Sequence, residues 1–165
     1  MSETDVRITG GCQCGAVRYA LHAVPTNPHI CHCRMCQKAF GSFFAPLARV
    51  PLDEFELTRG ALAVFRSSGP TERGFCRECG TPLTFRYLDK ERINISLGSL
   101  DDPEQIPPQH QYGIEGRLSW FDALATLPGE TTTEEDAPDL AGRIAATSHQ
   151  HPDHDTAVWP PEAGA

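Results

Sequence analysis

Seven cysteines in three short clusters constrain this 165-residue chain more than any other feature of its sequence. The clusters are Cys12 and Cys14, then Cys31, Cys33 and Cys36, then Cys76 and Cys79. Neighbours within a cluster are two or three positions apart, so a single turn of backbone can direct their sulfurs at one ion. The first residues hold no apolar signal core, which predicts a cytoplasmic, reducing location. There, clustered thiols are typical of metal sites rather than disulfides.

The seven thiols divide naturally into one site of four ligands and one of three. The outer two clusters then form a closed site, made by Cys12, Cys14, Cys76 and Cys79. The middle cluster forms a three-ligand site by itself. Spacing also allows Cys33 and Cys36 to join the third cluster, with the other three thiols left over. We favour the first division because each site is then built from whole clusters.

A three-thiolate site indicates a particular chemistry. A closed zinc shell has four ligands and is structural, whereas a catalytic zinc has three protein ligands and an open position. Three anionic sulfurs outweigh the charge of Zn²⁺, so such a site activates water poorly and suits a soft fourth ligand. The sequence therefore predicts activation of a substrate thiol rather than hydrolysis. The alternative is that both metals are structural and neither is catalytic.

Short strands and turns should make up most of the fold, because the chain has 14 glycines and 14 prolines. Residues 83–87 and 93–97 predict a strand pair around the polar turn at 89–91. Residues 55–57 and 62–65 predict a hairpin around Arg59-Gly60. Further strands are expected at 17–21 and 43–50, and helices at 34–40 and after Pro138. The expected fold class is mainly β with few short helices.

Charge is spread unevenly along the chain. The formal net charge is −8, and residues 130–165 hold eight acids and only one base. The nearly neutral body and acidic tail lack the basic surface that nucleic acids or anionic lipids require. The longest apolar run, 43–48, is far too short to span a membrane. We expect a domain at 1–127 and an acidic extension at 128–165, which begins with a linker at 128–136.

The extension contains three histidines, His149, His151 and His154. Histidine-rich tracts can bind metal, and this one could fold back over the site as a ligand or lid. A solvated tail is the interpretation that we favour, because chain ends are commonly poorly ordered.

Three segments together resemble the signatures of the glutathione-dependent formaldehyde-activating enzyme family, which also includes centromere protein V-like domains. They are residues 10–19 (GGCQCGAVRY), 31–38 (CHCRMCQK) and 74–83 (GFCRECGTPL), and residues 95–103 (ISLGSLDDP) resemble the family's strand and turn. The resemblance covers about residues 7–125 and implies an Mss4-like β fold with two zinc ions. It implies a structural zinc on Cys12, Cys14, Cys76 and Cys79, and a catalytic zinc on Cys31, Cys33 and Cys36.

The resemblance also implies an activity. The chain would be a carbon–sulfur lyase, similar to S-(hydroxymethyl)glutathione synthase, with glutathione or a related thiol as co-substrate. It would add that thiol to formaldehyde or another small aldehyde, or cleave such adducts. The alternative is a non-catalytic, zinc-stabilised Mss4-like module that binds a protein partner. The middle cluster favours the enzyme, because a pure scaffold needs only the four-thiolate site.

Side chains other than cysteine give weaker signals. His32 lies inside the metal loop, where a packing role is the simpler interpretation, and His110 is interpreted as structural or exposed. Positive groups would suit the carboxylates of glutathione, and the candidates nearest in sequence to the middle cluster are Arg34, Lys38 and Arg49.

Overall fold

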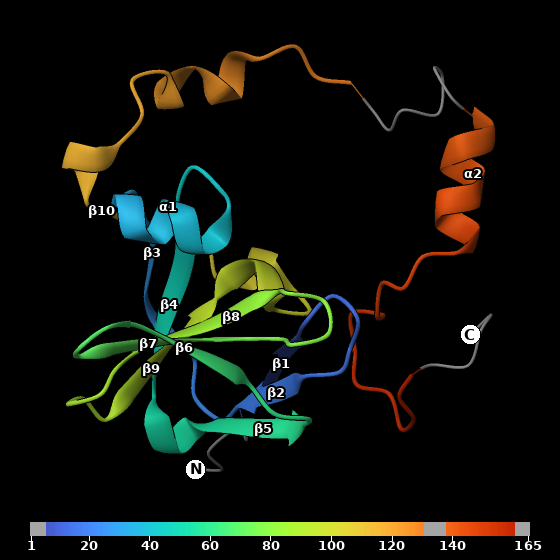
Figure 1. The fold of residues 1–165 in the computed structure, drawn as a ribbon, viewed down its shortest axis with the longest axis horizontal. Coiled ribbons are helices and arrows are strands. Elements are labelled where there is room, and N and C mark those ends of the chain that lie inside the picture. The colour runs from blue at the N-terminus through green and yellow to red at the C-terminus, as the bar shows by residue number, and fades with distance from the viewer. Residues whose placement is uncertain (1–5, 131–137, 161–165) are drawn as a thin grey trace.

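Two mostly antiparallel sheets form the body of the protein (Figure 1). The computed structural model describes residues 6–130 and 138–160. The small sheet has the order β1-β2-β5, with β1 (Ile8–Gly11), β2 (Arg18–Leu21) and β5 (Phe55–Arg59). The large sheet has the order β10-β3-β4-β9-β8-β7-β6. Its strands are β10 (His110–Tyr112), β3 (Thr26–Cys31), β4 (Ala45–Pro51), β9 (Arg92–Ser96), β8 (Pro82–Tyr87), β7 (Thr71–Phe75) and β6 (Ala63–Ser68).

Helical structure is short in the described residues. The α-helices are α1 (Arg34–Phe40) and α2 (Pro138–Ala146). The 3₁₀ helices are η1 (Leu52–Glu54), η2 (Leu97–Ser99), η3 (Pro103–Gln105), η4 (Ile114–Gly116) and the longer η5 (Phe121–Thr126). None of these helices is long and apolar enough to cross a membrane. The predicted fold class, mainly β with few short helices, is confirmed.

The two faces of the large sheet differ in character. Side chains alternate between faces along each strand, so residues of one parity share a face. On one face Val50, Ile93 and Ile95 pack against Tyr19 and Leu21 of the small sheet, and all five are buried. The opposite face carries polar and charged side chains and borders a cavity. The hydrophobic core therefore lies between the sheets, and the cavity lies on the outer face of the large one.

Several predicted elements are confirmed. The helix at 34–40 has the expected bounds, and β8 and β9 form the expected antiparallel pair. The helix expected after Pro138 is α2, which begins at Pro138 itself. Strands also occupy most of the expected ranges 17–21 and 43–50. Most of the predicted linker at 128–136 lies outside the described residues.

The hairpin predicted at 55–65 is wrong. β5 pairs with β2 in the small sheet, whereas β6 pairs with β7 in the large one, so the chain changes sheets at Gly60. Gly60 has φ of 69°, and a Cβ atom there would lie 2.1 Å from the carbonyl oxygen of Ala16. The preceding Arg59 donates a hydrogen bond to the Gly15 carbonyl. Long-range pairing with this loop, rather than the local turn pattern, decides the path of the chain.

Replacing Gly60 with alanine is expected to lower the free energy of unfolding by about 2 kcal/mol or more. The new Cβ would strain the left-handed backbone and meet a backbone oxygen, which cannot rotate away. Urea denaturation measures the loss. Gly69→Ala is the matched control, because a Cβ at Gly69 has nothing within 4 Å. Equal stabilities for the two variants would contradict the prediction.

The end of the described chain returns to the body. His151 is only 2% exposed, and its backbone N–H donates to the Gln13 carbonyl at 2.7 Å. Trp159 donates from Nε1 to the Cys14 carbonyl at 2.6 Å, and Asp155 forms an ion pair with Arg18. The interpretation of residues 149–165 as a solvated tail is therefore wrong for the residues that make these contacts, and 161–165 lie outside the described residues. Residues 150–159 (segment 150–159) pack beside the first cysteine cluster.

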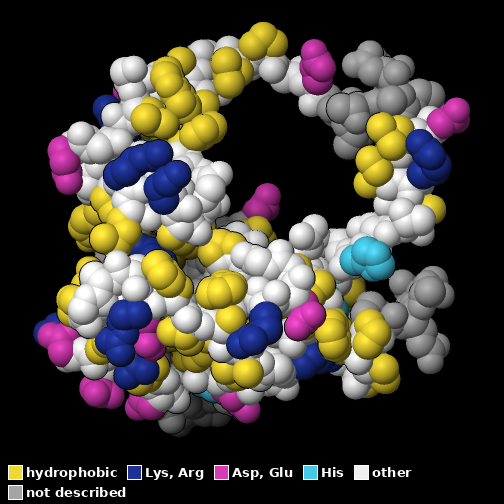
Figure 2. Space-filling view, in the orientation of Figure 1, with side chains coloured by type: hydrophobic (Ala, Val, Ile, Leu, Met, Phe, Trp, Pro, Cys, Tyr) yellow, Lys and Arg dark blue, Asp and Glu magenta, His cyan; other side chains and the backbone are white. Residues whose placement is uncertain are grey.

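Helix α2 stands apart from the sheets in both views (Figures 1 and 2). Its apolar residues Leu140 and Ile144 are exposed, which is consistent with the open space between this helix and the body in the space-filling view. The contacts of segment 150–159, rather than those of α2, hold the C-terminal part to the domain.

Candidate metal and substrate site

Four sulfurs meet where the two sheets come together. Cys12 and Cys14 follow β1, and Cys76 and Cys79 lie in the connection between β7 and β8. Their Sγ atoms all lie within 4.8 Å of one another, with 3.7 Å between Cys12 and Cys14 and 3.9 Å between Cys14 and Cys76. Four sulfurs placed tetrahedrally about 2.3 Å from a zinc ion would be about 3.8 Å apart. The cluster therefore fits one tetrahedral metal ion.

Local backbone geometry shapes this cluster. Gly15 and Gly80 each have φ of 78° and donate their N–H groups to the carbonyls of Cys12 and Cys76. Such turns are accessible to glycine at little cost and bend the chain behind each pair. Burial alone would raise the pKa of Cys79, but its hydrogen bonds with Thr81 and Cys14 together outweigh burial and lower the pKa to about 6. A sulfur that is anionic near neutral pH is prepared to bind a cation.

Three further sulfurs meet at the start of α1. Cys31 ends β3, Cys33 precedes the helix, and Cys36 lies in its first turn. Their Sγ atoms also lie within 4.8 Å of one another. Cys33 caps the helix, because its sulfur accepts a hydrogen bond from the Cys36 N–H at 3.4 Å. The cap fixes two of the three sulfurs relative to each other, and this cluster also fits a metal ion.

A buried cation lies beside the three-cysteine cluster. Arg73 donates from Nη2 to the sulfur of Cys36 at 3.5 Å, and its guanidinium lies 4.8 Å from the centre of the Phe85 ring. Hydrogen bonding from Cys31, with help from Arg73, lowers the pKa of Cys36 to about 5. The pKa of Cys31 is raised because its hydrogen bond to Cys36 favours the protonated form. Arg73 thus stabilises negative charge on this cluster.

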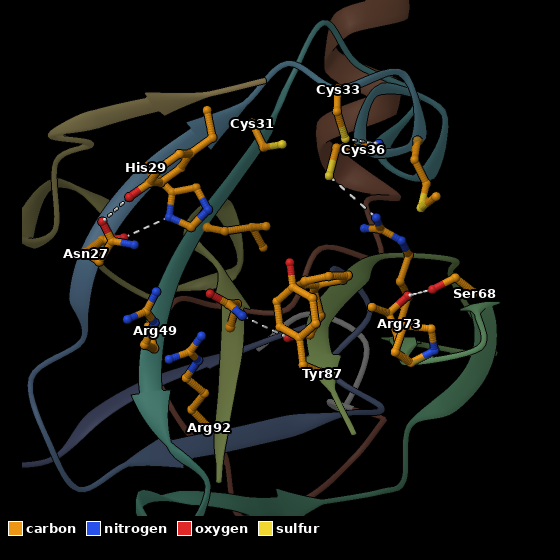
Figure 3. A pocket seen from close by; sticks show the side chains of 17 residues that line it. Asn27, His29, Cys31, Cys33, Cys36, Arg49, Ser68, Arg73, Tyr87 and Arg92 are labelled. Carbon is orange, nitrogen blue, oxygen red and sulfur yellow. Dashed lines mark hydrogen bonds between the residues drawn. The ribbon is translucent and has the colours of Figure 1, made fainter. Parts of the chain in front are cut away.

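The three-cysteine cluster opens into a cavity of about 670 Å³ (Figure 3). This volume is in the range of small-molecule sites. Figure 3 shows the cysteines at one end, and Arg49 and Arg92 beside each other at the other end. Leu47 and Phe85 contribute apolar lining between them. The four-cysteine cluster contributes only Cys12, and to a different, smaller pocket.

Sheet register explains how distant residues reach this cavity. His29 pairs with Leu47, Arg49 pairs with Asn94, and Phe85 pairs with both Asn94 and Arg73. Paired residues share a face, so five strands, β3, β4, β9, β8 and β7, direct these side chains to the same side of the sheet. The site is therefore a property of the whole sheet rather than of one loop.

The predicted side chains fall into separate groups. All seven cysteines lie in the two clusters, grouped as four and three, and the sulfurs do not adopt the second division. His32 is fully buried between Phe44 and Phe121, with Nε2 2.9 Å from Gln111 Oε1, and it does not line the cavity.

Of the other side chains considered from the sequence, one arginine lines the cavity. His110 is exposed on β10, Arg34 bonds to Gln37, and Lys38 lines another pocket, so only Arg49 of the positive candidates lies in the cavity. Sequence reasoning missed Arg73 and Arg92, and alternation along β7 and β9 was the one available signal. The ring nitrogens of His151 bond to the Pro152 carbonyl and to Thr156.

Together, two packed sheets and two thiolate clusters, one beside a cavity, define a β-rich protein whose cysteines are arranged for metal binding. Residues 7–115 match the profile of the family described as glutathione-dependent formaldehyde-activating enzyme, or GFA. Because the match spans more than half of the chain, the protein belongs to the GFA family.

Individual relatives are more distant. A protein of Podospora anserina is 34% identical over 82 residues, which are 48% of this chain and 38% of that protein. A protein of Emericella nidulans is 30% identical over 99 residues, which are 53% and 50% of the two chains. Both bear the family's enzyme name as a provisional assignment, and the chain spans half or less of their length.

One solved structure shows a likeness of fold. A crystal structure of a Rhodobacter sphaeroides protein matches with a TM-score of 0.52 and 23% identity. The match covers 62% of this chain and 98% of that one. At this identity the likeness supports the β architecture of the body alone.

Proposed function

We propose that this protein is a zinc-dependent enzyme of the carbon–sulfur lyase kind. It binds glutathione or a related thiol and adds it to formaldehyde or another small aldehyde, or cleaves such adducts. The observation that carries the proposal is the three-cysteine cluster, whose sulfurs line a cavity of about 670 Å³. A structural site needs no such opening, whereas a thiol substrate needs both a soft cation and space beside it.

In this proposal each part of the site has a role. Cys31, Cys33 and Cys36 would hold a zinc ion, which when bound supplies the positive charge that lowers the pKa of a thiol. Arg73 offsets the excess negative charge of three thiolates through its contact with Cys36. Apolar walls at Leu47 and Phe85 limit water near the reacting atoms.

The proposed reaction is the addition of a thiol to an aldehyde, with no change in the total number of protons or electrons. The substrate thiol loses its proton, its sulfur attacks the aldehyde carbon, and the C–S bond forms as the carbonyl π bond opens. The carbonyl oxygen takes up a proton and becomes a hydroxyl group. Cleavage of the adduct is the same sequence in reverse. The cavity contributes proximity, because it holds the thiol where a small aldehyde can enter.

The second cluster has a structural part in the proposal. Cys12, Cys14, Cys76 and Cys79 would close the shell of a second zinc ion and join the two sheets. A cytoplasmic location belongs to the same proposal, because none of the seven thiols forms a disulfide and a reducing compartment keeps them available. The boundary between a domain at 1–127 and an extension at 128–165 also remains a proposal.

Native mass spectrometry with and without glutathione tests the proposed function. We expect two zinc ions per chain and one glutathione bound to the zinc-loaded protein. NMR exchange measurements should then show faster formation of S-(hydroxymethyl)glutathione than the spontaneous reaction. Two zinc ions with no response to any thiol would instead favour the non-catalytic binding module.

Arg73→Gln is expected to weaken zinc retention by the three-cysteine cluster by about 10- to 100-fold. The variant removes the cation that contacts Cys36, so three thiolates repel one another more strongly. Competition with a chelator, followed by mass spectrometry, measures loss of the first and second ions separately. Arg73→Lys keeps the positive charge, so its zinc retention should lie between that of the parent protein and that of Arg73→Gln. Unchanged zinc retention in Arg73→Gln would show that Arg73 acts in packing alone.

A further inference from the structure

Two arginines of the cavity have no anionic partner. The Nε atoms of Arg49 and Arg92 are buried and make no hydrogen bond, and neither guanidinium forms an ion pair within residues 6–130 and 138–160. Both residues are half-buried. Buried polar atoms such as these Nε groups are normally hydrogen-bonded, because desolvation without compensation is costly. Both side chains line the same cavity as the three cysteines.

Sheet register forces these two charges together. Arg49 of β4 pairs with Asn94 of β9, and Arg92 lies two residues from Asn94, opposite Pro51. The two arginines are therefore diagonal neighbours on one face, as Figure 3 shows. Like charges in this arrangement repel, so the fold bears a cost that an anion in the cavity would relieve.

We propose that Arg49 and Arg92 form a carboxylate subsite that selects thiol substrates bearing carboxylates and disfavours neutral or cationic thiols. The inference rests on the proposed function, and it assigns a substrate class to the same cavity. A guanidinium presents paired N–H donors that match a carboxylate. The cysteines lie at the opposite end, so a ligand that reaches both needs its thiol and carboxylate separated as in a small peptide.

The rest of the protein provides a matched arginine outside the subsite. Arg86 follows Phe85 on β8 and therefore faces the other side of the sheet, where its nearest acid is Glu72 at 4.0 Å. It does not line the cavity. Arg86→Gln thus removes the same group from the same sheet without changing the proposed subsite.

Calorimetric titration of the full-length, zinc-loaded protein with S-methylglutathione tests the subsite. This probe keeps both carboxylates but has no thiol to bind a metal. We expect it to bind about tenfold or more tightly than its diethyl ester. Arg49→Gln and Arg92→Gln should each weaken binding of the acid about tenfold, Arg92→Lys should weaken it less, and Arg86→Gln should leave it unchanged.

The outcomes separate this inference from the proposed function. Equal affinity for acid and ester, no binding of either by the parent protein, or parent-like binding in both glutamine variants would overturn the subsite. Thermal melts identify a variant that fails to fold, and the two independent arginines guard against that case. If S-methylglutathione binds as expected but glutathione causes no thiol-dependent change at the zinc site, the proposed function fails and the subsite stands.

Discussion

Cys33→Ser should leave a folded protein that holds one zinc ion and no longer activates thiols, whereas Cys76→Ser should fail to fold stably. The two cysteines belong to different clusters, and the clusters have different places in the fold. Cys33 lies at the start of α1, on the cavity side of the large sheet, and is partly exposed. Its loss would disturb one helix cap and one proposed zinc ligand, while the core between the sheets remains.

Cys76 lies in that core. It is fully buried, and it packs in the same cluster as Cys12, Tyr19 and Leu83. Its site joins the loop after β1 to the connection between β7 and β8, so the four sulfurs connect the two sheets. Structural zinc sites contribute about 10–16 kcal/mol, which is as large as the whole stability of a typical domain, about 5–15 kcal/mol.

Three measurements check this contrast. Native mass spectrometry counts the zinc ions, circular dichroism with thermal melting reports the fold, and the NMR assay reports thiol addition. For Cys33→Ser we expect one zinc ion, a melting temperature close to that of the parent and no catalysed reaction. For Cys76→Ser we expect aggregation or a non-cooperative melt. A folded, two-zinc Cys33→Ser protein with parent activity would refute the assignment of the three-cysteine site.

The fold was predictable where hydrogen bonds are local. Helix 34–40 and the β8–β9 pair follow from patterns within a few residues, and both are found. The predicted hairpin at 55–65 failed because β5 takes its partner from β2, far away in sequence. Strands β3 and β7 showed no strand pattern, since they carry polar residues such as Asn27 and Arg73 toward the cavity instead of an apolar face. Polar residues that line the cavity thus replace the alternating apolar pattern on which strand prediction depends.

The candidate site shows the same limit. Both clusters could be predicted from cysteine spacing, because neighbouring cysteines of each group are two or three residues apart in sequence. Arg34 and Lys38 seemed equally good candidates by nearness alone, yet neither lines the cavity. Arg73 and Arg92 reach the cavity only through register across neighbouring strands. Sequence alone does not give register between strands whose partners are not already known.

Arg18→Ala is expected to cause the second large effect, a loss of about 3–5 kcal/mol in the free energy of unfolding. Arg18 is only 3% exposed, and its Nη atoms donate to both Asp101 oxygens at 2.7 and 2.5 Å. It also donates from Nε to Asp155 at 3.1 Å. Burial raises the pKa of both carboxyls, but hydrogen bonds, chiefly from Arg18 to Asp101 and from Arg7 and Arg18 to Asp155, outweigh it and lower each pKa. Alanine would leave two anions facing each other without this cation.

Arg18 also holds segment 150–159 to the body through Asp155. Its loss should therefore lower global stability and release the segment, and a second variant can distinguish these two effects. Asp155→Asn removes only the outer carboxylate, which is 34% exposed, and should cost about 1 kcal/mol or less. It should still free Trp159 from the Cys14 carbonyl. Limited proteolysis measures release of the segment, and urea denaturation measures global stability. We expect both variants to be cut faster near residue 155 and only Arg18→Ala to unfold at much lower urea.

A double variant identifies the origin of the Arg18 effect. Arg18→Met with Asp101→Leu removes the buried cation and its inner anion together and fills the space with apolar side chains. Replacing a buried ion pair in this way is often neutral, because the desolvation cost of both charges disappears with their attraction. We therefore expect the double variant to regain most of the stability that Arg18→Ala loses. If it is as unstable as Arg18→Ala, the loss arises from packing around β2 rather than from the unpaired carboxylate of Asp101.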